Sequence, residues 1–329
     1  MDIDSARKLL VAKIYDGNFE ASKSLELYGP VYTGHNSRIY RVCSLDLPFD
    51  GALKFCLQSR TTKPDKDGAQ QQFSTLKKVS AAMPGDARYA VPCPLLFFPD
   101  SAAYLVEWIS GQSASAGLFM GSAVISDLEY LVTESARWLY RFHQGNQAGV
   151  GRLDVHRKLS ALAHVTRHRD RRTRLFGRIF DRLVYYADAA ERPELRRSWL
   201  HGDFKSDNII INTKRIVGID IQAQTENFVV YDIASYINHI DLNAGYLKYK
   251  TLKKNKSELY ERFLAAYFSE SSTTGSMMLP VSWARTYMLL VGWCRARQMK
   301  HGALRTAFLQ RQFRSSIDNA LRELEWYAR

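Results

Sequence analysis

The sequence contains few of the features that mark exported, membrane-spanning or disordered proteins. Its 329 residues include only 9 prolines, and no low-complexity tract or internal repeat is visible. No uncharged apolar run approaches the roughly 18 residues that a membrane-spanning helix needs. The N-terminal segment begins with acidic residues and lacks a long apolar region, which predicts an amphipathic helix rather than a signal peptide. We therefore expect a soluble protein without a membrane span.

Cysteine is also scarce. The chain has 4 cysteines, scattered without the spacing of a metal site and set in apolar stretches: Cys43, Cys56, Cys93 and Cys294. This pattern predicts packed free thiols rather than disulfides or zinc ligands. A reducing, cytoplasmic compartment fits best.

Charge is abundant and uneven. The composition, with 46% hydrophobic and 24% charged residues, is that of a globular protein, and the formal net charge is +13. Residues 152–198 hold 13 Lys and Arg against 6 Asp and Glu. Such a surface attracts phosphates, nucleic acid or anionic lipid heads, but a merely solvated helix face explains the pattern equally well.

The first third of the chain predicts a small β-rich lobe with one helix. Residues 28–45 alternate around Gly29 and Gly34, which is typical of two strands joined by a turn. A third strand is predicted at 51–57, a helix around 68–85, and two more strands within 93–111. We place the end of this lobe at residue 107.

Residues 108–329 predict a helical lobe that contains one hairpin. Ser126 and Glu129 form a capping-box pattern before a long amphipathic helix. The basic segment 152–190 and four later segments carry helical apolar periodicity. Between them, residues 209–221 predict a tight hairpin with its turn at 212–214.

The segment HGDFKSDNIII, residues 201–211, concentrates polar groups before that hairpin. Phosphoryl transfer from a nucleotide requires a group that accepts the proton of the attacking hydroxyl and a metal that neutralises phosphate charge. Asp203 is placed to act as that base. Asn208 and Asp220 offer the oxygen ligands that Mg²⁺ prefers. The sequence therefore predicts a phosphotransferase site.

HGDFKSDN followed by GID resembles the catalytic segments of the aminoglycoside phosphotransferase and choline kinase-like family, distant relatives of protein kinases. The resemblance covers about residues 28–240. It implies an α+β, bilobal protein-kinase-like fold with a small antiparallel β lobe and a larger helical lobe. It also implies Asp203 as catalytic base, Lys205 as a γ-phosphate contact, and Asn208 and Asp220 as metal ligands.

The same resemblance implies residues that hold the nucleotide. YTGHNSRIYRV resembles the loop over the phosphates, where Gly34 lets the backbone approach while Asn36 and Ser37 offer donors. It lacks the full glycine triplet of protein kinases. GALKF resembles the strand whose lysine clamps the α- and β-phosphates, which gives Lys54 that role.

YLVEWISG resembles the hinge between lobes, where Glu107, Trp108 and Ile109 would offer groups to the purine. Asp232, in YDIASYI, resembles a structural aspartate of the family, which implies a buried acceptor that supports the catalytic loop. His143 matches the end of the preceding helix and is expected to be a packing residue.

One position departs from the family pattern. Gln72 stands where the family normally has the glutamate that pairs with the strand lysine. Three outcomes stay open: a weaker clamp on Lys54, substitution by another carboxylate such as Asp67, or reduced catalysis. The segment after Asp220 is also unusual, since it continues as Ile221 and Gln222.

The sequence thus predicts transfer of the γ-phosphate of ATP, with Mg²⁺, to a hydroxyl of a small molecule. Because residues 152–198 are basic, a neutral or anionic acceptor is favoured over a cationic one. A protein kinase-like enzyme is one alternative, although only eleven residues separate Asp220 from Asp232. A nucleotide-binding pseudokinase that serves as an interaction module is another. Nucleic-acid binding ranks last, because the basic segment lacks interleaved aromatic residues.

Overall fold

The computed structural model resolves the chain into two compact units. The first comprises residues 1–111 and 212–221, and the second comprises 112–211 and 222–329. The described residues are 2–18, 20–34, 36–46, 50–59, 61–83, 88–120, 127–166, 173–222, 226–243, 250–269, 274–298 and 303–328. The division falls close to the predicted boundary at residue 107 and also assigns 212–221 to the first unit. That the two lobes are domains stays a prediction.

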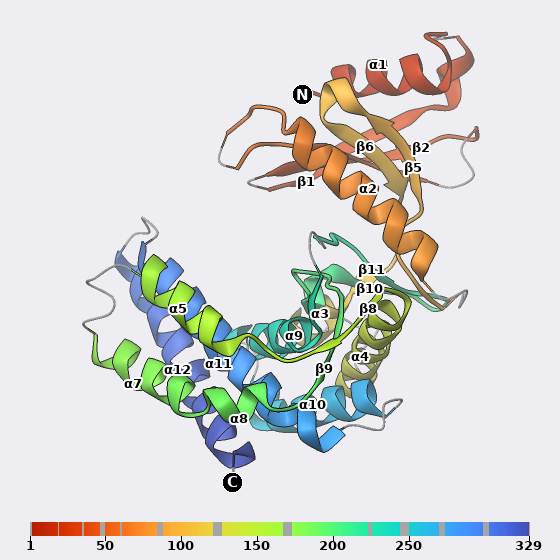
Figure 1. The fold of residues 1–329 in the computed structure, drawn as a ribbon. Coiled ribbons are helices and arrows are strands. Elements are labelled where there is room, and N and C mark those ends of the chain that lie inside the picture. The colour runs from red at the N-terminus through yellow and green to blue at the C-terminus, as the bar shows by residue number, and fades with distance from the viewer. Residues whose placement is uncertain are drawn as a thin grey trace. The chain divides into compact units, whose positions relative to one another are not determined.

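The first unit is built on an antiparallel sheet in the order β1-β2-β3-β6-β5 (Figure 1). Its strands are β1 (Glu26–Thr33), β2 (Ser37–Cys43), β3 (Gly51–Cys56), β5 (Pro94–Phe98) and β6 (Ala103–Glu107). Two helices accompany the sheet, α1 (Ile3–Ile14) and α2 (Lys66–Ala82). The short strand β4 (Tyr89–Ala90) pairs with β11 (Ile216–Gly218) in parallel.

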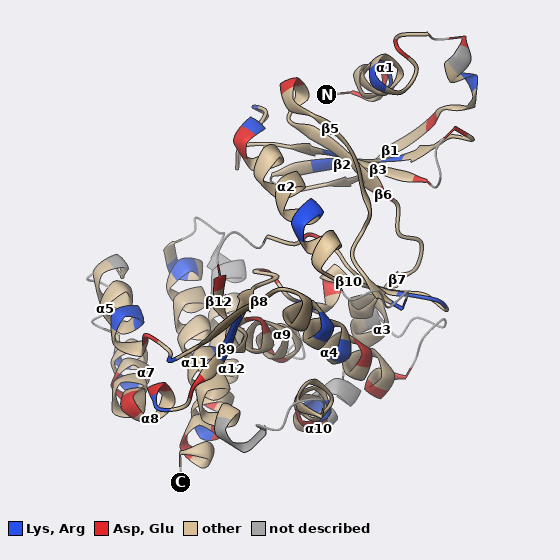
Figure 2. Cartoon of the chain, turned by 45° about the vertical axis from the view of Figure 1, so that its right-hand side comes forward, with Lys and Arg blue, Asp and Glu red and all other residues tan. Residues whose placement is uncertain are grey.

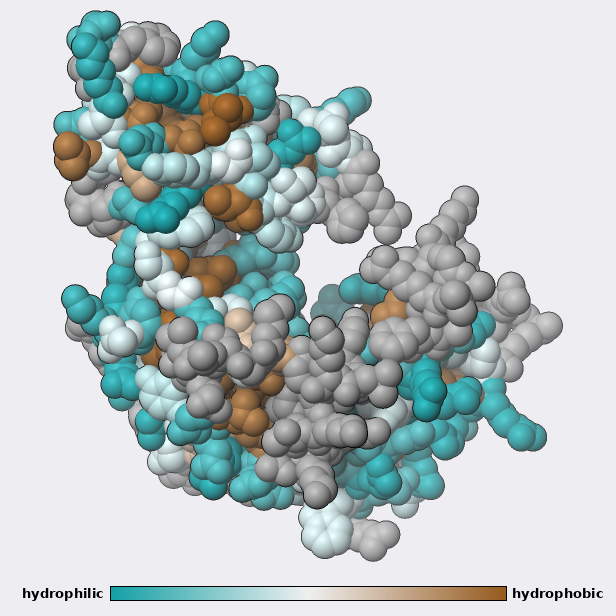
Figure 3. Space-filling model, turned by 180° about the vertical axis from the view of Figure 1, so that it is seen from behind, coloured by the Kyte–Doolittle hydropathy of each residue, from teal (hydrophilic) through white to brown (hydrophobic). Residues whose placement is uncertain are grey.

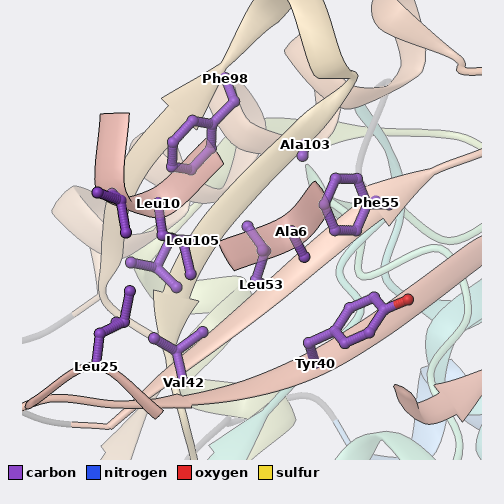
Figure 4. Close-up of a cluster of buried hydrophobic side chains, with 11 residues drawn as sticks. Ala6, Leu10, Leu25, Tyr40, Val42, Leu53, Phe55, Phe98, Ala103 and Leu105 are labelled. Carbon is purple, nitrogen blue, oxygen red and sulfur yellow. The ribbon is translucent and has the colours of Figure 1, made fainter. Parts of the chain in front are cut away.

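The two helices cover opposite faces of this sheet because successive strand residues point to opposite sides. On one face, Leu53 and Leu105 pack with Leu10 of α1 in an apolar cluster (Figure 4). On the other, Tyr104 packs with Phe73 of α2. Lys54 lies between Leu53 and Phe55 in β3, so its side chain is directed to the α2 face.

The second unit is mainly helical. Its principal helices are α3 (Ala114–Met120), α4 (Leu128–Gly145), α5 (Val155–Val165), α7 (Arg174–Tyr185), α8 (Ala187–Glu191), α9 (Val230–Asn243), α10 (Lys250–Phe268), α11 (Thr274–Gln298) and α12 (Ala303–Tyr327). α11 packs against both α9 and α12. A small sheet in the order β12-β9-β8 is formed by Glu226–Phe228, Leu195–Trp199 and Gln147–Gly151. Strand β10 (Ile209–Ile211) pairs with β7 (Gln112–Ser113).

The predicted α+β class, with an N-terminal antiparallel sheet and a helical remainder, is confirmed. Two local predictions are wrong. The cap of α4 is Asp127, whose carboxylate accepts from the Tyr130 amide at 3.0 Å, while the predicted Ser126 lies outside the described residues. Cys93 is exposed rather than packed.

Hydrophilic and hydrophobic side chains are interspersed on the described surface that Figure 3 displays. No helix within the described ranges is both long and apolar enough to span a bilayer.

Candidate active site

The segment 200–208 of the second unit is fixed by one buried carboxylate. Asp232, in the first turn of α9, accepts from the His201 amide at 2.6 Å and from the Gly202 amide at 3.1 Å. Gly202 has φ +84°, a conformation that glycine adopts without steric cost. The predicted role of Asp232 as a buried acceptor beneath this loop is confirmed.

His143 extends the support below Asp232. Its Nε2 lies 3.1 Å from the Asp232 carboxylate, and its Nδ1 lies 2.7 Å from the Tyr267 hydroxyl. A carboxylate only accepts, so Nε2 carries the proton and Nδ1 accepts from Tyr267. Burial lowers the pKa of His143 more than Asp232 raises it, so the ring is neutral. The predicted packing residue is therefore also a hydrogen-bond relay.

Acidification is expected to destabilise the native state through His143. Its native pKa lies below the ordinary value of 6.5, so the unfolded chain binds a proton that the native chain does not. The free energy of unfolding then falls as pH drops through 6.5, by at most about 1.4 kcal/mol between pH ~7.5 and ~5.5. Urea unfolding of the wild type and of His143→Gln at pH ~7.5 and ~5.5 measures this difference. Equal pH dependence in the two proteins would show that His143 does not contribute.

A column of aromatic rings positions the loop from its other side. Phe204 is fully buried and stacks between Trp138 of α4, at 5.7 Å, and Tyr236 of α9, at 5.2 Å. Tyr236 in turn stacks on Phe263 of α10 at 4.4 Å. Because Phe204 directly follows Asp203, this packing fixes where the Asp203 carboxylate emerges.

The Asp203 carboxylate is partly exposed and contacts two of the other predicted residues. Lys205 Nζ donates to Oδ2 of Asp203 at 2.6 Å. Asn208 Nδ2 donates to the Asp203 carbonyl at 2.9 Å and to its Oδ2 at 3.3 Å. Since the Asn208 amide donates through its nitrogen, its Oδ1 is the atom left to coordinate a cation. The second unit thus brings together the predicted base, the predicted phosphate contact and one predicted metal ligand.

In the first unit, Lys54 and Asp220 form an ion pair. Lys54 Nζ lies 2.8 Å from Asp220 Oδ1, with 14% of the lysine side chain exposed. Burial alone would lower the pKa of Lys54, but the neighbouring Tyr104 and Asp220 raise it above its ordinary value. Asp220 has φ +57°, a left-handed conformation that aspartate tolerates better than bulkier residues and that clusters at functional sites.

The carboxylate that contacts Lys54 is therefore neither at position 72 nor at Asp67, which is exposed in the first turn of α2. Gln72 Oε1 instead accepts from the Tyr104 hydroxyl at 3.0 Å. Tyr104 lies directly opposite Lys54 in the β3–β6 register. Burial raises the pKa of Tyr104 to about 12, despite the opposing effect of Lys54.

Replacing Gln72 with glutamate is expected to lower the KM for ATP about fivefold. A hydrogen bond from Lys54 to a carboxylate contributes roughly 1 kcal/mol more than one to an amide, so Lys54 would be held more firmly. The substitution would also leave Asp220 less tied to Lys54. Initial rates at varied ATP measure the change. Gln70→Glu is the matched control, because Gln70 is exposed and bonds Ser74 at 2.8 Å. An unchanged KM in Gln72→Glu would show that position 72 does not act on Lys54.

Residues at the predicted hinge, 107–110, bond to residues 212–215 at the turn of the hairpin. The Glu107 carboxylate is bound by the Arg215 guanidinium and accepts from the Cys93 amide at 3.2 Å. Asn212 Nδ2 donates to the Ser110 carbonyl at 2.8 Å. The Glu107 side chain is thus engaged in structure rather than turned to a ligand.

Two of the three backbone amides at the predicted hinge already donate hydrogen bonds within the protein, which leaves fewer of them for a nucleotide. The amide of Glu107 donates to Cys93 at 2.9 Å and that of Trp108 donates to Asp50 at 2.7 Å. Trp108 also carries the Arg41 guanidinium 5.4 Å from its ring centre. Ile109 is therefore the predicted hinge residue whose amide is not used in these sheet contacts.

The predicted phosphate-covering loop is a turn between β1 and β2. The Gly34 amide donates to the Ser37 carbonyl at 2.9 Å, and the Asn36 carbonyl accepts from the Leu57 amide at 2.8 Å. Asn36 is exposed whereas Ser37 is buried. Of the three predicted residues, Asn36 therefore has the side chain most accessible to a ligand.

These donor sets suit a nucleotide with a hard divalent cation. Mg²⁺ in such sites takes one or two protein oxygens together with phosphate oxygens, rather than a cage of side chains. Asp220 and the Oδ1 of Asn208 supply oxygens of this kind. Within the described residues, no group of three or more His, Cys, Asp or Glu side chains lies close enough together to hold a metal ion.

Several residues of the site escaped the sequence analysis. Tyr104 was missed because its position opposite Lys54 depends on strand register, which alternation alone does not reveal. Arg215 was missed because its partner lies more than one hundred residues away in sequence. Gln222 was noted in the sequence as unusual, but its contact was not predicted: its amide donates to the His201 carbonyl at 2.8 Å.

Two comparisons used the sequence of the chain, one against models of protein families and one against curated proteins. A family model described as the phosphotransferase enzyme family (APH) matches residues 51–278. A search of curated proteins by sequence gave no significant match.

Solved structures share the fold at low identity. A choline/ethanolamine kinase family protein from Mesorhizobium loti is 13% identical with a TM-score of 0.63, over 99% of this chain and 100% of that one. Amicoumacin kinase hAmiN, in complex with AMP-PNP, Ca²⁺ and Ami, is 14% identical with a TM-score of 0.62, over 97% and 94%. A thermostable mutant of aminoglycoside phosphotransferase APH(4)-Ia, with AMP-PNP and hygromycin B, is 15% identical with a TM-score of 0.60, over 97% and 98%.

Proposed function

We propose, from the premise that the chain belongs to the phosphotransferase enzyme family, that it transfers the γ-phosphate of ATP to a hydroxyl group of a small molecule. Family membership confirms the predicted class of enzyme, a small-molecule kinase. The observation that carries the specific proposal is the Asp203 carboxylate, partly exposed and held by Lys205 at 2.6 Å and by Asn208. A carboxylate fixed in this way is placed to orient a hydroxyl and accept its proton.

The remaining roles follow from the side chains. Lys205, which pairs with Asp203 at 2.6 Å, would stabilise charge on the transferred phosphoryl group. In the first unit, Lys54 would exchange its contact with Asp220 for the α- and β-phosphates. The freed Asp220, with Asn208 Oδ1, would then hold the divalent ion. When bound, that ion neutralises phosphate charge.

ATP and Mg²⁺ are the proposed cofactors. Support comes from amicoumacin kinase and aminoglycoside phosphotransferase APH(4)-Ia, both solved with the ATP analogue AMP-PNP. The former structure also contains Ca²⁺. The oxygen ligands proposed here suit Mg²⁺, which is the smaller of these two hard cations.

For the acceptor we propose a neutral or anionic molecule. The net charge of +13 favours encounter with anions over cations. The structure reduces the contribution of residues 152–198 to this argument. Arg178 and Arg182 pair with Asp318 at 2.5 Å and with Glu325 at 3.3 Å, respectively. The acceptor therefore has to be found by direct comparison of neutral sugars, sugar phosphates, nucleosides and aminoglycosides.

ADP formation with this acceptor panel tests the proposal. The wild type is expected to turn over only with Mg²⁺ and one acceptor class, and EDTA should abolish the reaction. Lys54→Ala should raise the KM for ATP at least about tenfold, since a partly buried charge contact is worth roughly 1.5–3 kcal/mol. Lys66→Ala is the control, because Lys66 is 60% exposed and lies 3.8 Å from Asp100.

Two other results would redirect the assignment. Turnover only with protein substrates would favour the protein kinase-like alternative. Intact ATP binding without magnesium-dependent turnover on any acceptor would favour an interaction module. Preference for aminoglycosides would overturn the proposed acceptor charge while leaving the reaction class in place.

A further inference from the structure

The last third of the chain contains a basic stretch that the proposed reaction does not use. Residues 271–317 include 7 Lys and Arg but no Asp or Glu. This stretch covers all of α11 and the first half of α12. Basic residues of α7 and α12 are marked in Figure 2. Arg285 is buried and already paired with Asp241 at 3.4 Å and with Glu323, so the question of an anionic partner concerns the other basic residues of the stretch.

Part of this stretch lines a recess of about 380 Å³. The recess lies among the start of α7, the end of α11 and the first half of α12, and its volume is within the usual ~300–1,000 Å³ range of small-molecule pockets. Four of its side chains are arginines and another is an amide: Arg174, Arg297, Arg311, Arg314 and Gln310. None of the described residues that line it is acidic.

Further along α7 and α12, next to the recess, arginines are paired with carboxylates. There Arg178 pairs with Asp318 at 2.5 Å, and Arg182 pairs with Glu325 at 3.3 Å. At these two positions, carboxylates of α12 therefore neutralise arginines of α7. Acidic residues thus line the part of α7 and α12 that contains Arg178 and Arg182, whereas none is among the described residues that line the recess.

Two features of the recess favour an anion: a guanidinium restricted by stacking, and positive potential at the start of α7. Arg297 lies 4.8 Å from the ring centre of Trp293, a residue only 3% exposed, and this stacking restricts the guanidinium. Arg174 occupies the first turn of α7, where the helix dipole adds positive potential. Thr173 caps that helix through the Phe176 amide at 3.2 Å. Four like charges around one recess repel each other, and a bound anion removes that repulsion.

We propose that this recess binds a small molecule that carries two or more phosphate groups. Guanidinium groups form paired hydrogen bonds with phosphate oxygens, and arginine supplies all the cationic side chains among the described lining residues. The four guanidinium groups come from three helices, so a ligand with several phosphates can contact more of them than a single phosphate can. Such a ligand is either free in solution or the head group of a phosphoinositide.

Calorimetric titration of the full chain with inositol 1,4,5-trisphosphate and with pyrophosphate tests the site. The double variant Arg311→Gln and Arg314→Gln is expected to weaken Kd at least about tenfold, since it removes two of the four cationic side chains that line the recess. Both side chains are exposed, so the fold should be retained, which thermal unfolding checks. The matched control, Arg178→Gln with Arg182→Gln, should change Kd less than about threefold because those arginines are neutralised by carboxylates.

Lys54→Ala separates this site from the nucleotide site. Loss of trisphosphate binding in Lys54→Ala, with binding intact in the Arg311 and Arg314 variant, would overturn the proposal. Equal Kd values in all variants would overturn it as well. Sedimentation with phosphatidylcholine vesicles containing phosphatidylinositol 4,5-bisphosphate identifies the source. Vesicle binding that depends on Arg311 and Arg314 supports a lipid head group, and binding of free trisphosphate alone supports a soluble ligand.

Discussion

Replacing Asp203 with asparagine is expected to lower kcat by about 10³-fold while the KM for ATP changes less than about threefold. A positioned general base contributes roughly 10²–10⁴ to the rate. The substitution keeps the shape of the side chain and its contact with Asn208, so the loop geometry should persist. Steady-state kinetics at saturating acceptor measure the split between kcat and KM.

Asp207→Asn provides the matched control for Asp203→Asn. Asp207 lies on the same loop, is 50% exposed, and contacts His239 at 3.7 Å. Removal of its charge should leave kcat within about threefold, since an exposed pair contributes little. If both variants lost activity equally, the loss would come from the overall charge of the loop rather than from a base at position 203.

Replacing Asp232 with alanine is expected to lower the free energy of unfolding by about 3–5 kcal/mol, because each buried hydrogen bond to a carboxylate contributes roughly 1.5–3 kcal/mol. Asp232 is 2% exposed and accepts from the amides of His201 and Gly202 and from His143. All three donors would lose their acceptor, and two of them, on His143 and His201, are fully buried, where water cannot replace it. Urea unfolding monitored by tryptophan fluorescence measures the effect.

The surface pair of His156 and Asp188 is the control for this prediction. Its nitrogen-to-oxygen distance is 3.0 Å, almost the same as in the buried pair, but Asp188 is 82% exposed. Asp188→Ala should cost less than about 1 kcal/mol, because water replaces the lost contact. If Asp232→Ala and Asp188→Ala lowered the free energy of unfolding by similar amounts, burial would not explain the contribution of Asp232 to stability. Asp232→Ala should also lower kcat, since the loop that carries Asp203 loses its support.

Some of the site could be predicted because its residues are close in sequence. Asp203, Lys205 and Asn208 lie on one short loop, so their spacing alone determined that they would meet, and the structure shows all three in contact. Asp232 and His143 were expected to be structural residues, and the buried pair between them agrees. The sheet and most helices followed from the alternating and helical patterns of apolar residues, which depend on local geometry.

Other contacts depend on tertiary packing and left no local signal. The partner of Lys54 is one example, because the sequence left open Gln72 or another carboxylate such as Asp67, and only the fold shows the contact with Asp220. The strands β8, β9 and β12 were missed because they are short and pair across long sequence separations. The arginines of α7 were interpreted as a free basic face, whereas Arg178 and Arg182 meet carboxylates contributed by α12.

Transfer of radiolabel from the γ-phosphate of ATP is the most direct measurement of the central claim. The label should appear on a small-molecule hydroxyl in the presence of Mg²⁺ and should remain in ATP when Asp203→Asn replaces the wild type. Label recovered only as inorganic phosphate or on protein, or transfer that is unaffected by Asp203→Asn, would contradict the account.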